Sequence, residues 1–214
     1  MVKVSFRCSL SVLFFLGGIL TIRLSVLSNL ESLVISTSHN LISPVLHTIN
    51  ASDIEHASKN LPDIWEAVGK LTIAWASLES ALTGLLINES GTLPHTGYIM
   101  IGRMSSKAKF DKIIKIMKAN KFPKEAIDSV IKWKKDTAIP CEIRNIISHC
   151  TLLGEDKNDA NLLYFGGTRA PEEADTIICH KLYLREILWV ANFAQKLALI
   201  IYELALKQLQ SRLE

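Results

Sequence analysis

The sequence predicts an all-α fold: an antiparallel bundle of about four to five helices, with a short β-hairpin-like insertion before the last helix. Apolar residues recur at helical spacing in two long segments, residues 61–87 and 181–211, as in helices that pack lengthwise against each other. The composition is 49% hydrophobic and 21% charged, with only 10 Gly and 6 Pro. Such a chain can bury a core, and this composition excludes an intrinsically disordered protein.

The first 60 residues are expected to lie outside the bundle. Residues 1–24 contain an apolar run, residues 8–22, preceded by Lys3 and Arg7. This run is shorter than the roughly 20 residues that span a bilayer. It is therefore interpreted as an uncleaved membrane anchor, a signal peptide or an upstream extension of the translated sequence. Residues 25–60 are rich in Ser, Asn and His and are expected to be a linker. We expect a cytoplasmic protein, or a membrane-associated one if the apolar run is retained.

Residues 61–214 are expected to form the bundle. Its first helix has apolar residues that step by three or four positions, namely Val68, Leu71, Trp75, Leu78, Leu82 and Leu85. Two shorter helices, at about 105–118 and 124–137, each have one apolar side and one side rich in lysine. The last helix, from about 181 to 211, is long enough to lie antiparallel to the first and to reach a second copy of the chain.

A short hairpin is predicted between the fourth and the last helix. Residues 151–153 and 162–165 are apolar and are separated by a polar turn, and Gly166-Gly167 ends the second segment. Short apolar runs bounded by turn residues are typical of paired strands.

Most common catalytic and metal-binding motifs are absent from the sequence. It has no phosphate-binding glycine-rich loop, no dinucleotide fingerprint, no HExxH and no GxSxG. The four cysteines form no CxxC, and no Cys or His cluster has the spacing of a zinc site. We therefore expect no metal or cofactor, and reduced cysteines.

The segment from Cys141 to Cys150 carries the candidate site. On a helix, at about 100° per residue, Arg144, Ser148, Asn145 and His149 fall within one arc of roughly 140°. The apolar side chains of the same segment fall on the opposite side. An ordinary solvated helix face is the simpler interpretation, but this arc contains no lysine.

A carboxylate on the first helix could support this site. Glu79 lies beside the apolar row, about 100° from Leu78. It is either a solvated flanking residue or the group that orients the guanidinium of Arg144.

Positive charge is concentrated in the middle of the chain. Between Arg103 and Lys135 there are eleven Lys or Arg and three Asp or Glu, a net charge of +8. The candidate RNA-binding residues are Lys107, Lys112, Lys115, Lys132, Lys134 and Lys135, with Trp133 among them. Such a stretch is either a solubilising surface or a footprint for a phosphate backbone.

These residue types suit metal-independent cleavage of RNA. Arginine offers a permanent forked cation for a phosphodiester oxygen, and histidine transfers protons near neutral pH. The 2′-hydroxyl of RNA supplies the nucleophile, so the protein need only move protons and stabilise charge. One chain offers a single histidine in this arc, and two chains meeting across it would offer two.

The segment Arg144-Asn145-Ile-Ile-Ser-His149 resembles the R-x4-6-H motif of the HEPN superfamily, in which a polar residue often follows the arginine. The resemblance covers residues 61–214. It implies a helical bundle and a homodimeric endoribonuclease of toxin–antitoxin, phage-defence or RNA-processing systems, in some cases with a cognate antitoxin as partner. It also implies that Arg144 binds the scissile phosphate, that His149 is the acid or base, and that Asn145 positions phosphate or ribose. Glu79 and Ser148 would support them.

Two other interpretations stay open. The first is a non-catalytic helical module that binds RNA or a protein, in which Arg144 and His149 only tie helices together. The second is a membrane-anchored structural protein, with residues 8–22 as the anchor and the bundle as a soluble head.

Overall fold

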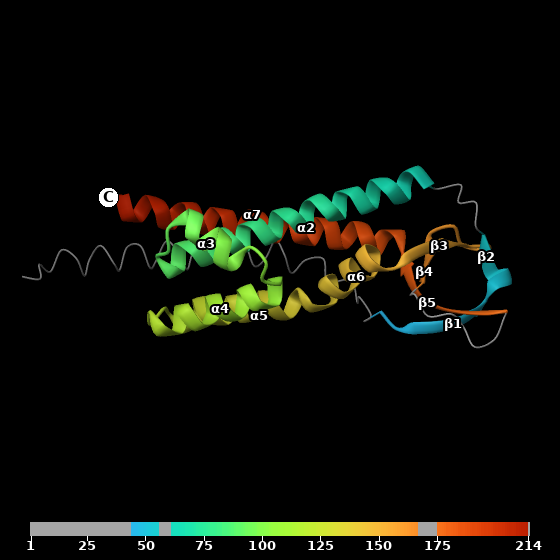
Figure 1. Ribbon diagram of the computed structural model, residues 1–214, viewed down its shortest axis with the longest axis horizontal. Coiled ribbons are helices and arrows are strands. Elements are labelled where there is room, and N and C mark those ends of the chain that lie inside the picture. The colour runs from blue at the N-terminus through green and yellow to red at the C-terminus, as the bar shows by residue number, and fades with distance from the viewer. Residues whose placement is uncertain (1–43, 56–60, 167–174, 214) are drawn as a thin grey trace, which may run out of the picture.

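The computed structural model describes residues 44–55, 61–166 and 175–213, and it has a mixed α+β fold. Long helices form one part of the molecule and a five-stranded antiparallel sheet forms the other (Figure 1). The prediction of an all-α bundle with a small hairpin is therefore wrong. The predicted hairpin is real, but it is the centre of a larger sheet.

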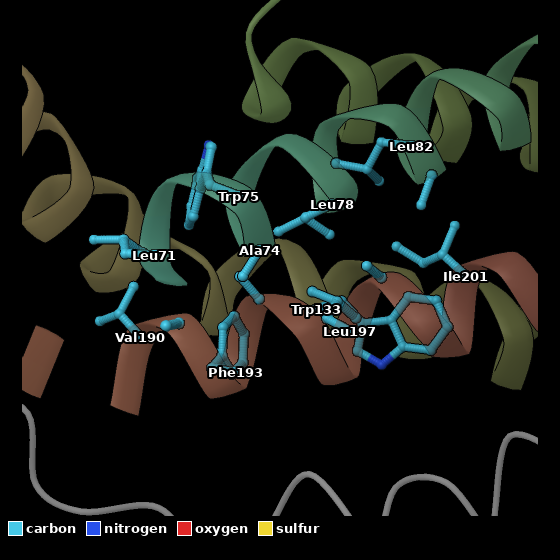
Figure 2. Packing of buried hydrophobic residues seen from close by; sticks show 14 of the residues in the cluster. Leu71, Ala74, Trp75, Leu78, Leu82, Trp133, Val190, Phe193, Leu197 and Ile201 are labelled. Atoms are coloured by element: carbon cyan, nitrogen blue, oxygen red, sulfur yellow. The ribbon is translucent and has the colours of Figure 1, made fainter. Parts of the chain in front are cut away.

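Two long helices form the spine of the fold. The helix α2 (Leu61–Ser90) lies antiparallel to α7 (Leu184–Leu213) along the long axis of the molecule (Figure 1). Figure 2 shows Leu71 facing Val190 and Leu82 facing Ile201, so the two apolar rows interdigitate. These side chains are almost fully buried, as expected for the seam of a lengthwise helix pair.

Four shorter helices join α2 to the sheet. They are α3 (Pro94–Ile101), α4 (Ser106–Ala119), α5 (Lys124–Asp136) and α6 (Ala138–His149). Proline begins α3, where its missing N–H is not needed. The hydroxyl of Ser105 caps α4 by accepting from the N–H of Ala108 at 3.3 Å. The helices α4 and α5 form a hairpin beside one half of α2, and α6 runs back towards the sheet (Figure 1).

The sheet draws its strands from two distant parts of the chain. Its strands are β1 (Leu46–Asn50), β2 (Ile54–Glu55), β3 (Thr151–Asp156), β4 (Leu162–Gly166) and β5 (Thr176–Tyr183). The order across the sheet is β1-β5-β4-β3-β2. The two edge strands, β1 and β2, both fall within the range 25–60 that was expected to be a linker, so part of that range belongs to the sheet.

The connection between the two edge strands forces the sheet to curl. A flat sheet of five strands would separate its edges by about 19 Å, at about 4.8 Å per strand spacing. The link from β1 to β2 is only the 3₁₀ turn Ala51–Asp53, and three residues in that conformation rise about 6 Å. The edges must therefore approach each other at this end, and the sheet forms a half-barrel.

The two faces of the curled sheet pack against different cores. Leu163, Phe165 and Leu182 belong to the main core beneath the helices. On the other face, Ile49, Ile54, Tyr164 and Cys179 form a small core inside the curl. The register pairs Leu163 with Leu182, which fixes the side chains that face the helices.

Two of the described helices are long and apolar enough to be compared with membrane spans. By length and composition, α2 and residues 184–206 of α7 could cross a membrane. About half of each apolar window is buried within the fold, 56% and 50%, and core helices of soluble proteins pass the same test. This is weak evidence for a span. The apolar run at 8–22 lies outside the described residues.

Candidate functional site

The helix α6 carries the candidate site on its solvent side. It begins at Ala138, two residues before Pro140, which the first turn of a helix tolerates. Ile143 and Ile146 are buried. On the other side of the helix, Asn145, Ser148 and His149 are exposed and Arg144 is half-buried. The helix ends at His149, and the next residue already has an extended backbone.

Arg144 is held by an aromatic ring and an amide. Its guanidinium carbon lies 5.9 Å from the centroid of the Trp75 ring of α2, within the range of a cation–π interaction. It also donates from Nη1 to Oδ1 of Asn145 at 3.0 Å. Within the described part of the chain, no carboxylate forms an ion pair with Arg144. Its positive charge is oriented but not neutralised.

His149 lies in the last turn of α6, apart from Arg144. The two residues are five positions apart, which is about 7.5 Å along the helix axis and roughly 140° around it. His149 is exposed. The two side chains therefore share one broad face of α6 but do not converge on a single point within one chain.

Glu79 does not pair with Arg144. Its carboxylate accepts from Nζ of Lys109 at 2.9 Å and from the hydroxyl of Ser106 at 2.7 Å. Lys109 also donates to the main-chain carbonyl of Glu79 at 3.3 Å. The structure therefore does not support the hypothesis that Glu79 orients Arg144. Glu79 ties α2 to α4, while Trp75, one turn earlier, contacts Arg144.

The electrostatics of Glu79 follow from these partners. Burial raises the pKa of Glu79, but hydrogen bonds from Ser106, Lys109 and Trp75 together with the Lys109 charge outweigh it, and the pKa lies below its ordinary value. Glu79 is therefore a carboxylate at neutral pH. It neutralises the buried ammonium of Lys109 and therefore has no proton to donate as a general acid.

Cys141 lies close to this cluster. Burial raises the pKa of its thiol, the positive charge of Arg144 acts in the opposite direction, and the charge of Glu79 adds to the increase. The amide of Asn145 is 3.8 Å from its sulfur. Cys141 is therefore a protonated thiol at neutral pH that lines the inner side of the site, and it is not an activated nucleophile.

The lysines predicted to bind RNA lie on α4 and α5. Those on α4 and Lys135 are exposed, while Lys132 and Lys134 are half-exposed. Lys134 forms an ion pair with Asp111 at 2.6 Å. Together with the nearby charges of Lys107 and Lys115, this contact lowers the pKa of Asp111. One carboxylate thus sits among several cations, and the surface keeps an excess of positive charge.

The residues that sequence reasoning missed are Lys109, Ser106 and the second role of Trp75. The charge count of residues 103–135 includes Lys109 with the basic surface, but Lys109 is only 1% exposed. Its position could have revealed this, because it falls on the same helical row as Phe110, Ile113 and Met117, which are all buried. A lysine on the apolar row of an amphipathic helix predicts a buried partner of opposite charge.

A second polar cluster lies inside the curled sheet. The hydroxyl of Tyr164 donates to Asp156, whose other oxygen accepts from the N–H groups of Asn158 and Asp159. These bonds hold the pKa of Asp156 below its usual range, and burial raises the pKa of Tyr164. Asp156 thereby fixes the β3–β4 turn, which is a structural role. Across the described ranges, no group of three or more His, Cys, Asp or Glu could hold a metal ion.

Comparisons with models of known protein families, with curated proteins and with solved structures found no match.

Proposed function

We propose that the chain is a metal-independent endoribonuclease that acts as a homodimer, as its resemblance to the HEPN superfamily implies. One observation carries the proposal. Arg144 is a half-buried guanidinium, oriented by Trp75 and Asn145, with no carboxylate partner among the described residues. A positive charge at such a position is usually paired, and a phosphodiester would supply the missing counter-charge.

The neighbouring groups fit the chemistry of RNA cleavage. In the proposed reaction, Arg144 binds a non-bridging phosphate oxygen and stabilises the charge that develops on it. His149, exposed at the end of the same face, transfers the proton to or from the reacting oxygens. Asn145 accepts from Arg144 through Oδ1 and donates one N–H of its amide to the sulfur of Cys141, so its second amide N–H can contact phosphate or ribose. Ser148 lies between Asn145 and His149 along the helix.

The basic α4–α5 hairpin would hold the RNA strand. The exposed lysines Lys107, Lys112, Lys115 and Lys135 and the half-exposed Lys132 and Lys134 would contact phosphates without reading the sequence. Binding of this kind weakens steeply as the salt concentration rises. The toxin–antitoxin or phage-defence setting, with a cognate antitoxin, belongs to the same proposal and rests only on the family resemblance.

Cleavage of a labelled RNA in the presence of EDTA tests the proposal. His149→Ala should lower the rate by about 10²- to 10⁴-fold, and Arg144→Lys should lower it as well because a point charge cannot replace the fork. The matched control is His95→Ala, which removes an exposed histidine from α3 and should cleave like the wild type. Undiminished cleavage by His149→Ala would refute the assignment.

A second candidate is a helical module that binds RNA or protein without catalysis. The contact between Arg144 and Trp75 favours it, because it joins α6 to α2 and gives Arg144 a structural role that needs no substrate. If this is the whole role of Arg144, Arg144→Ala should lower the melting temperature and change no activity. An unchanged melting temperature would exclude the structural role.

A further inference from the structure

Over five helical turns, one largely exposed face of α2 carries a single charged residue, Glu79 at its margin, and Lys109 and Ser106 already bind that carboxylate. The residues of this face, which we call the α2 face, are Leu61, Pro62, Trp65, Gly69, Thr72, Ile73, Ala76 and Ser80. At about 100° per residue they lie within an arc about 120° wide. Trp65 is 58% exposed and Ile73 is 72% exposed. Thr72 satisfies its hydroxyl within the helix by donating to the carbonyl of Val68 at 2.8 Å. A face that only meets water would normally carry charged residues.

Gly69 lies in the middle of this face, and no contact within its own chain requires a glycine there. A Cβ atom at Gly69 would meet no atom within 4 Å, and its φ is not in the left-handed region. Glycine is among the least favourable residues inside a helix. Such a residue lets another backbone approach closely, so a partner that packs against Gly69 would account for it.

We infer that the α2 face binds the α2 face of a second copy of this chain. Consider a two-fold axis between Lys70 and Leu71, with the two helices antiparallel. Residues whose numbers add up to 141 then oppose each other, which places Trp65 against Ala76 of the second copy and Leu61 against its Ser80. Gly69 opposes Thr72. Leu61 and Trp65 thus each face a small residue, which is the self-complementarity that an isologous interface requires. At the margins of the face, Ile73 opposes Val68 and Pro62 opposes Glu79.

The exposed area is sufficient for a reversible dimer. Side chains of this size have about 200 to 250 Å² of accessible surface, so Leu61, Trp65 and Ile73 together expose roughly 350 Å² at their observed exposed fractions. The five smaller residues add roughly 200 Å², which gives about 1,100 Å² for the two copies. If all of this area is buried, it passes the roughly 1,000 Å² that a biological interface needs and stays below the roughly 1,200 to 2,000 Å² of stable specific complexes, as expected for a reversible dimer.

This pairing would bring the two candidate sites together, and only this step rests on the proposed function. Arg144 is level with Trp75, and α6 runs antiparallel to α2 (Figure 1). By extrapolation His149 is level with about residue 70 of α2. In the pair, the partner's residue 70 opposes Leu71. Arg144 and the partner's His149 would then lie within about 6 Å along the axis of α2, on the same side of the dimer.

Sedimentation equilibrium of the full chain tests the surface. The wild type should form a dimer, and Trp65→Glu should weaken it at least 100-fold, because each substitution acts twice in a symmetric interface. Leu199→Glu is the matched control, since Leu199 is 57% exposed on α7, and it should leave the dimer intact. Gly69→Leu should weaken the dimer and keep the monomer folded. Gly84→Leu should not weaken it, although Gly84 has equal space in the same helix.

A charge pair tests the register. Trp65→Glu chains and Ala76→Lys chains should each be monomeric, and an equal mixture should sediment as a dimer because the introduced carboxylate would face the introduced ammonium. A mixture that stays monomeric would overturn the antiparallel register. A wild-type dimer that Trp65→Glu and Gly69→Leu leave unchanged would overturn the α2 face but not the proposed nuclease. A dimer that these variants dissociate, yet cleaves no RNA, would overturn the nuclease alone.

Discussion

The ion pair between Lys109 and Glu79 offers the sharpest test of how this fold is held together. Lys109→Met keeps most of the apolar stem and removes the ammonium, so the bonds of 2.9 Å and 3.3 Å to Glu79 are lost. Removing one partner of a fully buried pair costs about 3 to 5 kcal/mol. The Glu79 side chain is 29% exposed and keeps its bond from Ser106. We therefore expect a loss of about 2 to 3 kcal/mol in the free energy of unfolding.

Thermal and urea unfolding of the full chain measure this loss. For a protein of this size, about 2 to 3 kcal/mol lowers the melting temperature by about 5 to 10 °C. The double variant Lys109→Met/Glu79→Leu removes both charges, and it should be more stable than the sum of the two single losses indicates. The control is Lys70→Met, which breaks the exposed pair between Lys70 and Glu66 and should leave the urea midpoint unchanged.

Two results would refute this reasoning. A loss below about 1 kcal/mol for Lys109→Met would mean that water solvates Glu79 as well as the ammonium does. Additive losses in the double variant would mean that the two side chains stabilise the fold independently. In either case the cluster of Glu79, Lys109 and Ser106 would not link α2 to α4.

Three further predictions concern pH, backbone and reactivity. The lowered pKa of Glu79 adds stability that is fully present above the ordinary pKa of 4.5 and is lost as the pH falls below it. The free energy of unfolding of Glu79→Gln, measured by urea unfolding, should therefore fall less steeply with decreasing pH than that of the wild type. Gly154→Ala should lower the melting temperature markedly, because Gly154 has φ +154° and a Cβ there would collide with the carbonyl of Glu55. A soluble Gly154→Ala variant with the melting temperature of the wild type would contradict this. The raised pKa of Cys141 predicts that iodoacetamide modifies it at pH 7 more slowly than a free cysteine, as mass spectrometry of the peptide would show.

The helical part of the fold could be predicted from the sequence because its signals are local. The apolar row from Leu71 to Leu85 and the row of α7 are long and periodic, and both are buried as the spacing predicts. The polar face of α6 follows from the same spacing, and Asn145, Ser148 and His149 are exposed. Local periodicity was enough for these features.

The sheet could not be predicted because its pairing is not local. The strand β1 has five residues, of which only Ile49 is buried, so it resembles a loop until β5 lies beside it. The sequence predicts no strand for the first residues of β5, and its last residues fall in the range predicted for the final helix. In the same way, the charge of Glu79 does not reveal which cation it meets. The cation that pairs with Glu79 depends on how α4 crosses α2, and in the structure it is Lys109 and not Arg144.

The short link between β1 and β2 has a consequence for the order of folding. Leu46 pairs with His180, more than 130 residues later, so both edge strands wait for β5 and β3 while the helices form from near neighbours. During synthesis the first strands emerge long before their partners exist. A fragment that begins at Leu61 would lack both edges and leave the outer backbone groups of β3 and β5 open to other chains, which is a route to aggregation. We therefore expect a fragment that begins at Leu46 to aggregate less than one that begins at Leu61.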